Sequence, residues 1–383
     1  MLRNIRLLYI HTFVSTFRLY FAFQPIYFAQ VTGSYTAATA VLSVATITSA
    51  LMDIPTGVLS DKMGRRFTVV LASACLTVGT ALYAFATGIV GLFLGAVFCG
   101  LAMCLFNGNN NALLYESLKS TGQENEFHHY QGRKASMVSL GIGLSALCAS
   151  FLTGHGLRLL FILSILPQIL SVIIALFIEE PRVHETAPKK GLHHLKDACV
   201  KIWRNPHLRS LTIAQAFTYG ADDAKYQFQS VFFNTLWPTW AIGIYMTLNQ
   251  ILAFVSFWFA GRIVDRVRET LLLATQQVYW LVSQTIALIL SNTVTPVLFL
   301  SDAILFGPAM VARDHLMQKE FTDEQRATMG SVATFAASLV FSVVAFGIGV
   351  ISDHFGLAAG VGFGVAISAI ALPIYVGLFR KGF

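Results

Sequence analysis

The chain has 383 residues, of which 55% are hydrophobic and 12% are charged, and its formal net charge is +7. Soluble domains carry roughly 25% charged residues, so this composition excludes an ordinary water-soluble protein. It predicts an all-α integral membrane protein, because helices satisfy their own backbone hydrogen bonds in lipid. With ~20 residues per span and short connectors, the length accommodates about twelve membrane helices.

Apolar segments follow one another in chain order. In the first half they are residues 7–29, 37–59, 67–86, 88–106, 135–152 and 159–178. In the second half they are residues 211–233, 240–260, 271–290, 297–311, 332–351 and 357–378. The stretch between the halves is polar and contains Pro181, Pro188 and Gly191, which indicates a linker. We predict twelve transmembrane helices in two pseudo-symmetric six-helix bundles, residues 1–178 and 208–383, joined by residues 179–207.

Two short patterns recur in the two halves. Residues 57–66 (GVLSDKMGRR) are matched in degraded form by residues 261–268 (GRIVDRVR), and each copy joins two apolar segments. Residues 23–28 and 228–233 match in the first segment of each half. Such internal repeats are typical of secondary transporters. Because Arg268 stands where the first copy has Gly64, the second turn is expected to differ from the first.

Basic residues predict the orientation in the membrane. Of the 26 Lys and Arg, all but Arg18, Arg158 and Lys225 lie at the termini, in the linker or in alternate loops. By the positive-inside rule, both termini and the linker are cytoplasmic in a multi-pass protein of the cell membrane. The positive charge is then explained by insertion and by anionic lipid headgroups, and no nucleic-acid partner is expected.

Other functional classes lack their motifs. Residues 1–14 are not followed by a small-residue cleavage site, which argues against a signal peptide. The five cysteines show no zinc or disulfide spacing, and H-E-x-x-H, G-x-S-x-G and P-loop patterns are missing. We therefore expect no enzymatic activity, no cofactor and no metal.

The first copy of the repeat fits the pattern G-x-L-x-D-[RK]-x-G-[RK]-[RK]. With supporting matches at residues 53–57, 112–118 and 324–328, the whole chain resembles the major facilitator superfamily, and in particular bacterial exporters of drugs or other small molecules. The resemblance implies a monomeric secondary active transporter that moves a small organic molecule by alternating access, as proton-coupled export. The alternative is a proton- or sodium-coupled importer of an anionic or zwitterionic metabolite. Residues 88–106 lack the family's usual arginine, and residues 135–152 lack the Gly-Pro pair of its antiporters.

Residues of the repeat are predicted to form a gate. Gly57 permits close helix packing, Gly64 suits a tight turn, and Asp61 suits the positive N-terminal end of a helix, which the resemblance implies is span eleven. Asp53 shares a helix face with Gly57 and Asp61, so we assign it to this gate, a latch between helices, rather than to the substrate site. The predicted gating residues are Asp53, Gly57, Asp61, Gly64, Arg65, Arg66 and Asp265.

Charges inside the spans indicate the transport site, because a charge at the bilayer centre costs at least ~2.5 kcal/mol. Asp222 and Lys225 are spaced to pair on one helix. Arg18 aligns with Asp223 in the repeat, so it either pairs with that carboxylate or binds a substrate carboxylate or phosphate. A carboxylate here is either part of a permanent ion pair or a group that loads and releases a proton. The predicted substrate- or proton-binding residues are Arg18, Gln24, Tyr219, Asp222, Asp223, Lys225, Gln229 and Asn249.

Overall fold

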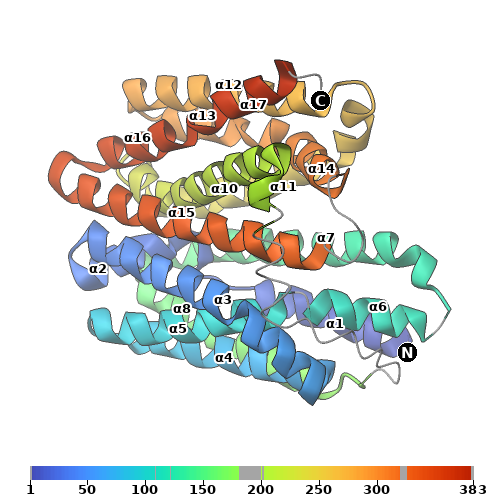
Figure 1. Cartoon of the computed structure of the whole chain (residues 1–383). Helices are drawn as coiled ribbons and strands as arrows, with labels where there is room; N and C mark the ends of the chain where they lie inside the picture. The colour runs from blue at the N-terminus through green and yellow to red at the C-terminus, as the bar shows by residue number, and fades with distance from the viewer. Residues whose placement is uncertain are drawn as a thin grey trace. The chain divides into compact units, whose positions relative to one another are not determined.

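The computed structural model describes residues 2–107, 109–120, 122–180, 200, 202–319 and 326–380. In this part of the chain the secondary structure is helical throughout, with no strand (Figure 1). Most of the predicted linker lies outside the described residues.

The first half of the chain contains helices at every predicted span. They are α1 (Leu2–Thr16), η1 (Phe21–Phe23), α2 (Gln24–Thr32), α3 (Tyr35–Met63), α4 (Arg65–Phe85), α5 (Ile89–Phe106), α6 (Asn109–Lys119), η2 (Glu124–Glu126), α7 (Phe127–Leu152), η3 (Thr153–His155) and α8 (Leu157–Leu176).

The second half also contains helices at every predicted span. Its helices are α10 (Pro206–Phe233), α11 (Thr239–Val264), α12 (Glu269–Leu290), α13 (Thr295–Ser301), α14 (Ala303–Lys319), α15 (Arg326–Phe355), α16 (Leu357–Ser368) and α17 (Ala371–Arg380). Of the described helical segments, nine are long and apolar enough to cross a membrane. The three other predicted spans are interrupted or more polar: the first is broken, α10 carries four charges, and α12 carries several glutamines.

The first predicted span is not one helix. Helix α1 ends at Thr16, and Arg18 lies in the irregular turn before η1 and α2. The backbone N–H of Leu19 donates to Ser164 Oγ on α8 at 3.0 Å, so a side chain replaces the missing helical hydrogen bond. The prediction of one continuous helix over residues 7–29 is therefore wrong.

A further expectation on helix ends is corrected. Helix α14 continues to Lys319, beyond the predicted end at residue 311, so Arg313 is a helical residue rather than a loop residue.

The helices form two compact units. One comprises Met1–Gly33, Val44–Pro188 and Thr239–Gln250, and the other comprises Ser34–Ser43, Lys189–Pro238 and Ile251–Phe383. Helices α3 and α11 are each shared between the two. The predicted domain boundaries at residues 178 and 208 stay a prediction.

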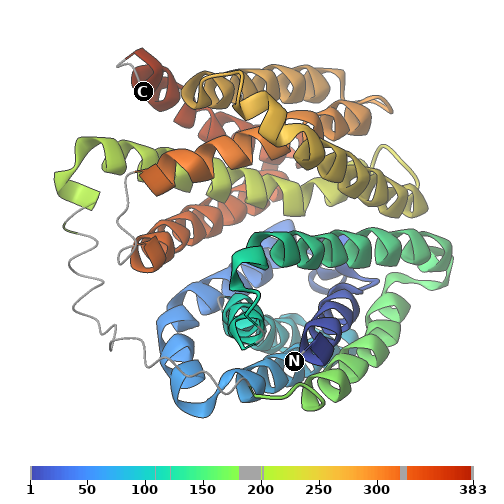
Figure 2. The same cartoon turned by 90° about the vertical axis from the view of Figure 1, so that its right-hand side faces the viewer.

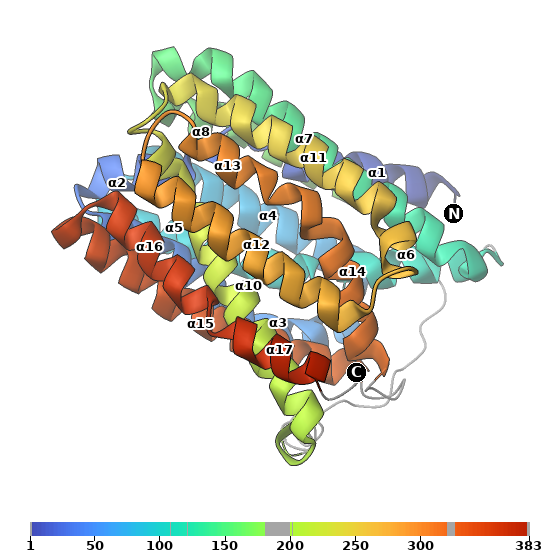
Figure 3. The same cartoon turned by 90° about the horizontal axis from the view of Figure 1, so that it is seen from above.

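Each unit has its own core. In the first, α1 and α4 both lie beside α8 (Figure 2), and buried residues of α1, α4, α6 and α8 form an apolar cluster that includes Leu8, Val69, Leu113 and Ala175. In the second, α10 packs on α15 and α16 (Figure 3), and an apolar cluster of α10, α12, α14 and α17 includes Leu211, Leu273 and Tyr375. These cores hold the polar groups described next at fixed places between helices.

Candidate functional site

A polar network lies among the helices of the second unit. Lys225 on α10 is only 3% exposed, and its Nζ lies 2.7 Å from Asp222 Oδ1, so the predicted pair is confirmed as a contact. The same Nζ donates to Gln284 Oε1 of α12 at 2.9 Å and to Ser368 Oγ of α16 at 3.1 Å. Gln284 Nε2 in turn donates to Asp302 Oδ2 at 2.7 Å. One ammonium group and one amide thus connect two carboxylates on different helices.

The Lys225 side chain passes close to the backbone of α16 at a glycine. A Cβ atom added at Gly364 of α16 would lie 2.5 Å from Lys225 Cγ, so only glycine lets the lysine stem pass at this position. The Asp302 backbone carbonyl is also held, because Trp280 Nε1 donates to it at 3.0 Å. The sequence analysis did not place Asp302 or Gln284 in the site. Their polar character inside apolar segments was the available signal.

A second buried cation lies on the same side of α10. The guanidinium of Arg313 is 4.3 Å from the ring centroid of Tyr219, and Arg313 is 4% exposed. At this distance the arginine is attracted to the ring face. Tyr219 is therefore a packing partner of a cation that the sequence analysis had assigned to a loop.

The other predicted residues of α10 differ in their surroundings. Asp223 is exposed and accepts a hydrogen bond from Gln227 Nε2 at 2.9 Å, whereas Gln229 is 6% exposed. The Asp222 side chain is 16% exposed. The predicted site residues of α10 are therefore partly packed inside the unit rather than all open to water.

The first unit contains the remaining predicted substrate residues. Arg18 is half-buried at the break between α1 and η1, with its guanidinium carbon 5.2 Å from the Phe21 ring centroid. Among the described residues of this unit, no carboxylate pairs with Arg18. Gln24 and Asn249 are half-buried at the start of α2 and within α11. Arg18 and Asp223 belong to different units, so their pairing stays a prediction.

The predicted gate has a defined local structure. Gly64 adopts φ 92° and ψ 160°, a region that favours glycine, and ends α3 one residue before α4 begins. In the second copy Arg268 has φ −58° and ψ 133°, which confirms that the two turns differ. Asp265 is exposed in that second turn, and Asp53 is half-buried in α3.

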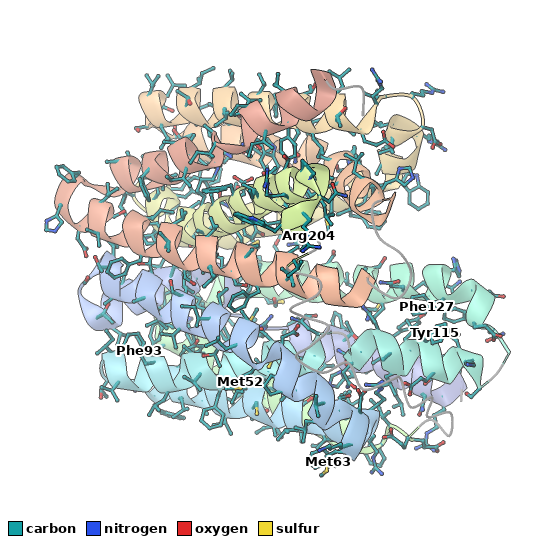
Figure 4. All side chains as sticks on the ribbon, viewed as in Figure 1. Met52, Met63, Phe93, Tyr115, Phe127 and Arg204 are labelled. Atoms are coloured by element: carbon teal, nitrogen blue, oxygen red, sulfur yellow. The ribbon has the colours of Figure 1, made fainter. Side chains whose placement is uncertain are left out.

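Arg65 is the centre of contacts in the gate. Its Nε lies 3.0 Å from Glu116 Oε1, and its guanidinium also contacts Asp61 at 3.2 Å and Ser60 Oγ at 2.8 Å. Asn109 fixes the arrangement by accepting from Ser60 Oγ at 2.7 Å and donating to the Arg65 carbonyl at 3.1 Å. The neighbouring α6 is held to α7 by an edge-on ring contact between Tyr115 and Phe127 (Figure 4).

The N-terminus of α4 is capped by a carboxylate that the sequence analysis missed. Glu180 accepts hydrogen bonds from the backbone N–H groups of Arg65 and Arg66 at 2.6 and 2.7 Å. A negative group at a helix N-terminus is stabilised by the unpaired N–H groups and the helix dipole. Arg66 also donates to the Leu176 carbonyl at 2.7 Å. The partner implied for Asp61, the start of span eleven, adjoins residues 320–325, which lie outside the described residues.

This capping contact leads to a stability prediction. Glu180→Gln removes the negative charge from the helix N-terminus, and we expect a loss of ~0.3–1 kcal/mol, seen as a lower melting temperature of the purified protein. Glu179→Gln is the matched control, because the Glu179 side chain forms an exposed pair with Arg3 at 3.7 Å and caps no helix in the described part of the chain. Equal melting temperatures for both variants would show that the cap contributes nothing measurable.

Among the described residues, apolar helices long enough to cross a membrane define a multi-pass membrane protein. The chain belongs to the Major Facilitator Superfamily, whose family model matches residues 7–345, so it is a membrane transporter rather than an enzyme. No curated protein sequence matches this chain.

Solved transporter structures share the fold. The nucleoside transporter NupG, as its D323A mutant, superposes with a TM-score of 0.82 at 15% identity, covering 99% of this chain and 100% of that one. A POT family transporter in complex with 5-aminolevulinic acid gives a TM-score of 0.79 at 10% identity, covering 99% and 96%. A bacterial homologue of the human lysosomal transporter Spinster gives 0.76 at 16% identity, covering 98% and 96%. At these identities the likeness shows the twelve-helix fold alone.

Proposed function

We propose that this protein is a secondary active transporter that moves a small organic molecule across the cell membrane by alternating access, driven by a proton. The observation that carries the proposal is the buried network of Asp222, Lys225, Gln284 and Asp302. Charges inside membrane spans are costly and mark ion pathways or substrate sites. The direction we propose is export, on the resemblance of residues 57–66 to exporters. We further expect a monomer with both termini in the cytoplasm.

The network offers a route for coupling. Lys225 contacts Asp222 directly and reaches Asp302 only through the amide of Gln284. If the lysine moves away from one carboxylate, that group loses its neutralising partner, and protonation becomes favourable. The helices that carry these groups, α10, α12 and the turn between α13 and α14, are separate elements. A shift between them during transport would therefore change which carboxylate holds a proton.

Identifying a substrate is the first step of the test. Thermal shifts of the purified protein would be measured with organic cations, organic anions, amino acids, sugars, nucleosides and small peptides. The last two classes are included because proteins of similar fold are named as nucleoside and peptide transporters. A stabilising compound would then be used in liposome flux measurements.

The coupling prediction concerns the carboxylates. We expect Asp302→Asn or Asp222→Asn to reduce net flux driven by a pH gradient to background, while substrate-for-substrate exchange continues. Glu126→Gln, which changes an exposed carboxylate of η2, serves as the control and should keep both activities. Equal losses of net flux and exchange in both Asp variants would remove the network from coupling. Flux that follows a sodium gradient but not a pH gradient would replace the proton by sodium.

A second function is favoured by Arg18. This half-buried cation lies at a break in a membrane helix and has no carboxylate partner among the described residues of its unit. Discontinuous membrane helices often form the binding sites of transporters. Under this alternative the protein imports an anionic or zwitterionic metabolite, whose carboxylate or phosphate Arg18 binds. Accumulation of such a compound on the cytoplasmic side would favour import over export.

A further inference from the structure

The gate sequence occurs a third time, at a place that the six-helix repeat does not explain. Residues 349–356 read GVISDHFG, against GVLSDKMG at residues 57–64, and five of the eight positions are identical. The repeat pairs residues 57–64 with residues 261–268 instead. The third copy lies at the C-terminal end of α15, whereas the first lies at the C-terminal end of α3.

The two copies have the same backbone. Gly356 has φ 90° and ψ 162°, against φ 92° and ψ 160° for Gly64. The Gly356 N–H donates to the Ser352 carbonyl at 3.1 Å, and the Gly64 N–H donates to the Ser60 carbonyl at 3.0 Å. In both places a new helix begins at the next residue. The shared residues therefore form the same sharp turn.

The aspartates of the two copies have different partners. Asp353 Oδ1 accepts from the Tyr35 N–H at 2.8 Å, and its Oδ2 accepts from the Thr36 N–H at 2.9 Å. The hydroxyls of Ser34 and Thr36 donate to the same Oδ2 at 2.7 and 2.6 Å. Asp353 thus caps the N-terminus of α3, where a negative charge is favoured. Asp61, in contrast, is 61% exposed in its side chain, and its recorded partner among the described residues is Arg65.

The first glycines of the two copies show the same contrast. A Cβ atom at Gly349 would lie 2.2 Å from Thr39 Oγ1 and 2.8 Å from the Tyr35 carbonyl, so α3 packs directly on this glycine. Among the described residues, a Cβ atom at Gly57 would meet nothing within 4 Å. The close contact that glycine permits is therefore seen, in the described part of the chain, at Gly349.

Other contacts extend along the same stretch of α3. Ser43 Oγ donates to the Ser342 carbonyl at 3.4 Å, and the Tyr35 ring packs edge-on against Phe228 of α10. These contacts explain why Ser34–Ser43 belongs to the second compact unit, although the rest of α3, from Val44, belongs to the first. A single helix thus continues from one unit into the other, and Asp353 holds its first turn.

We propose that residues 349–356 form a second latch, that is, a contact that holds one side of the transporter closed. This latch holds the first turn of α3 and keeps the non-cytoplasmic side closed. It alternates with the latch that residues 57–64 form on the cytoplasmic side. By the predicted orientation, α3 begins and α15 ends on the non-cytoplasmic side. In this structure Asp353 is engaged with the first turn of α3. The inference rests on alternating access in the proposed function, but it requires neither a known substrate nor a known coupling ion.

Hydrogen–deuterium exchange of the full-length protein in lipid nanodiscs, without substrate, tests the second latch. In Asp353→Asn we expect the amides of residues 34–43 to exchange about tenfold faster, as for the loss of a helix cap. We also expect residues 57–66 to exchange more slowly, because the cytoplasmic latch becomes more populated. Asp61→Asn should leave residues 34–43 at least as protected as in the wild type.

The controls separate a latch from a merely structural cap. His354→Gln changes the exposed neighbour of Asp353 and should alter neither segment. Faster exchange at residues 34–43 without slower exchange at residues 57–66 would overturn the proposal, and so would unchanged exchange at both. If Asp353→Asn fails to fold, Gly349→Ala replaces it, with Gly57→Ala as its matched control. Gly349→Ala should loosen residues 34–43 and Gly57→Ala should not, and equal effects would contradict the inference.

Discussion

Replacing Lys225 by methionine is expected to destabilise the protein by ~3 kcal/mol, near the lower end of the range for breaking a buried ion pair. The lower end applies because the Asp222 side chain is 16% exposed and keeps some access to solvent. Lys225→Met also leaves Gln284 Oε1 and Ser368 Oγ without their donor. For a protein of this size we expect the melting temperature to fall by about 4 °C.

A control variant and a double variant accompany Lys225→Met. Lys62→Met changes an exposed lysine beside the gate turn and should leave the melting temperature nearly unchanged. The double variant Lys225→Met, Asp222→Asn carries no unpaired charge at this position, so it should recover much of the lost stability. Additive losses in the double variant would mean that the pair contributes nothing by its charges. An unchanged melting temperature in Lys225→Met would show that the lysine is not needed to neutralise Asp222.

Features set by local sequence could be predicted. Each predicted apolar segment coincides with helix in the structure, because a span must cover the bilayer with apolar residues, although α7 and α14 extend beyond their segments. The contact between Asp222 and Lys225 follows from their spacing on one helix. The turn at Gly64 follows from the glycine itself, which adopts a φ that other residues rarely reach.

Features set by distant contacts could not be predicted. Asp302 and Gln284 join the network only because α12 packs beside the turn between α13 and α14. Glu180 caps α4 from a position far along the chain. Arg313 followed the last apolar residues of its segment, so hydropathy placed it in a loop, although the Tyr219 ring makes a buried position favourable.

The break before η1 shows a different limit. Residues 7–29 form one apolar segment around a single charge, and hydropathy alone predicts a continuous helix. The structure interrupts it where Ser164 of α8 accepts the Leu19 N–H. A hydroxyl on a neighbouring helix cannot be located from the sequence of the broken segment. Residues 349–356 can be recognised in the sequence as a third copy of the gate sequence. Their role, however, depends on the helix that Asp353 caps, which the sequence does not show.

Arg18→Gln is expected to weaken the binding of an anionic substrate by about 30-fold or more, because the loss of one partner from a buried charge pair costs ~2 kcal/mol or more. The reason is that Arg18 lies at a helix break, half-buried, with no carboxylate partner among the described residues of its unit. Its guanidinium is therefore available to bind a carboxylate or phosphate with two parallel hydrogen bonds. Binding would be measured by the substrate-induced shift in melting temperature.

A mutant cycle with Asp223 distinguishes this role from a permanent ion pair. If Arg18 binds substrate, Arg18→Ala should leave the melting temperature of the substrate-free protein nearly unchanged, and adding Asp223→Ala should not restore binding. Arg158→Gln is the matched control, because that arginine donates to the Ala84 carbonyl at 2.8 Å and has no assigned role in transport. A large loss of stability in each single variant, with recovery in the double variant, would instead identify Arg18 and Asp223 as partners. Arg18 would then leave the substrate site, and the importer of an anionic metabolite would lose the observation that favours it.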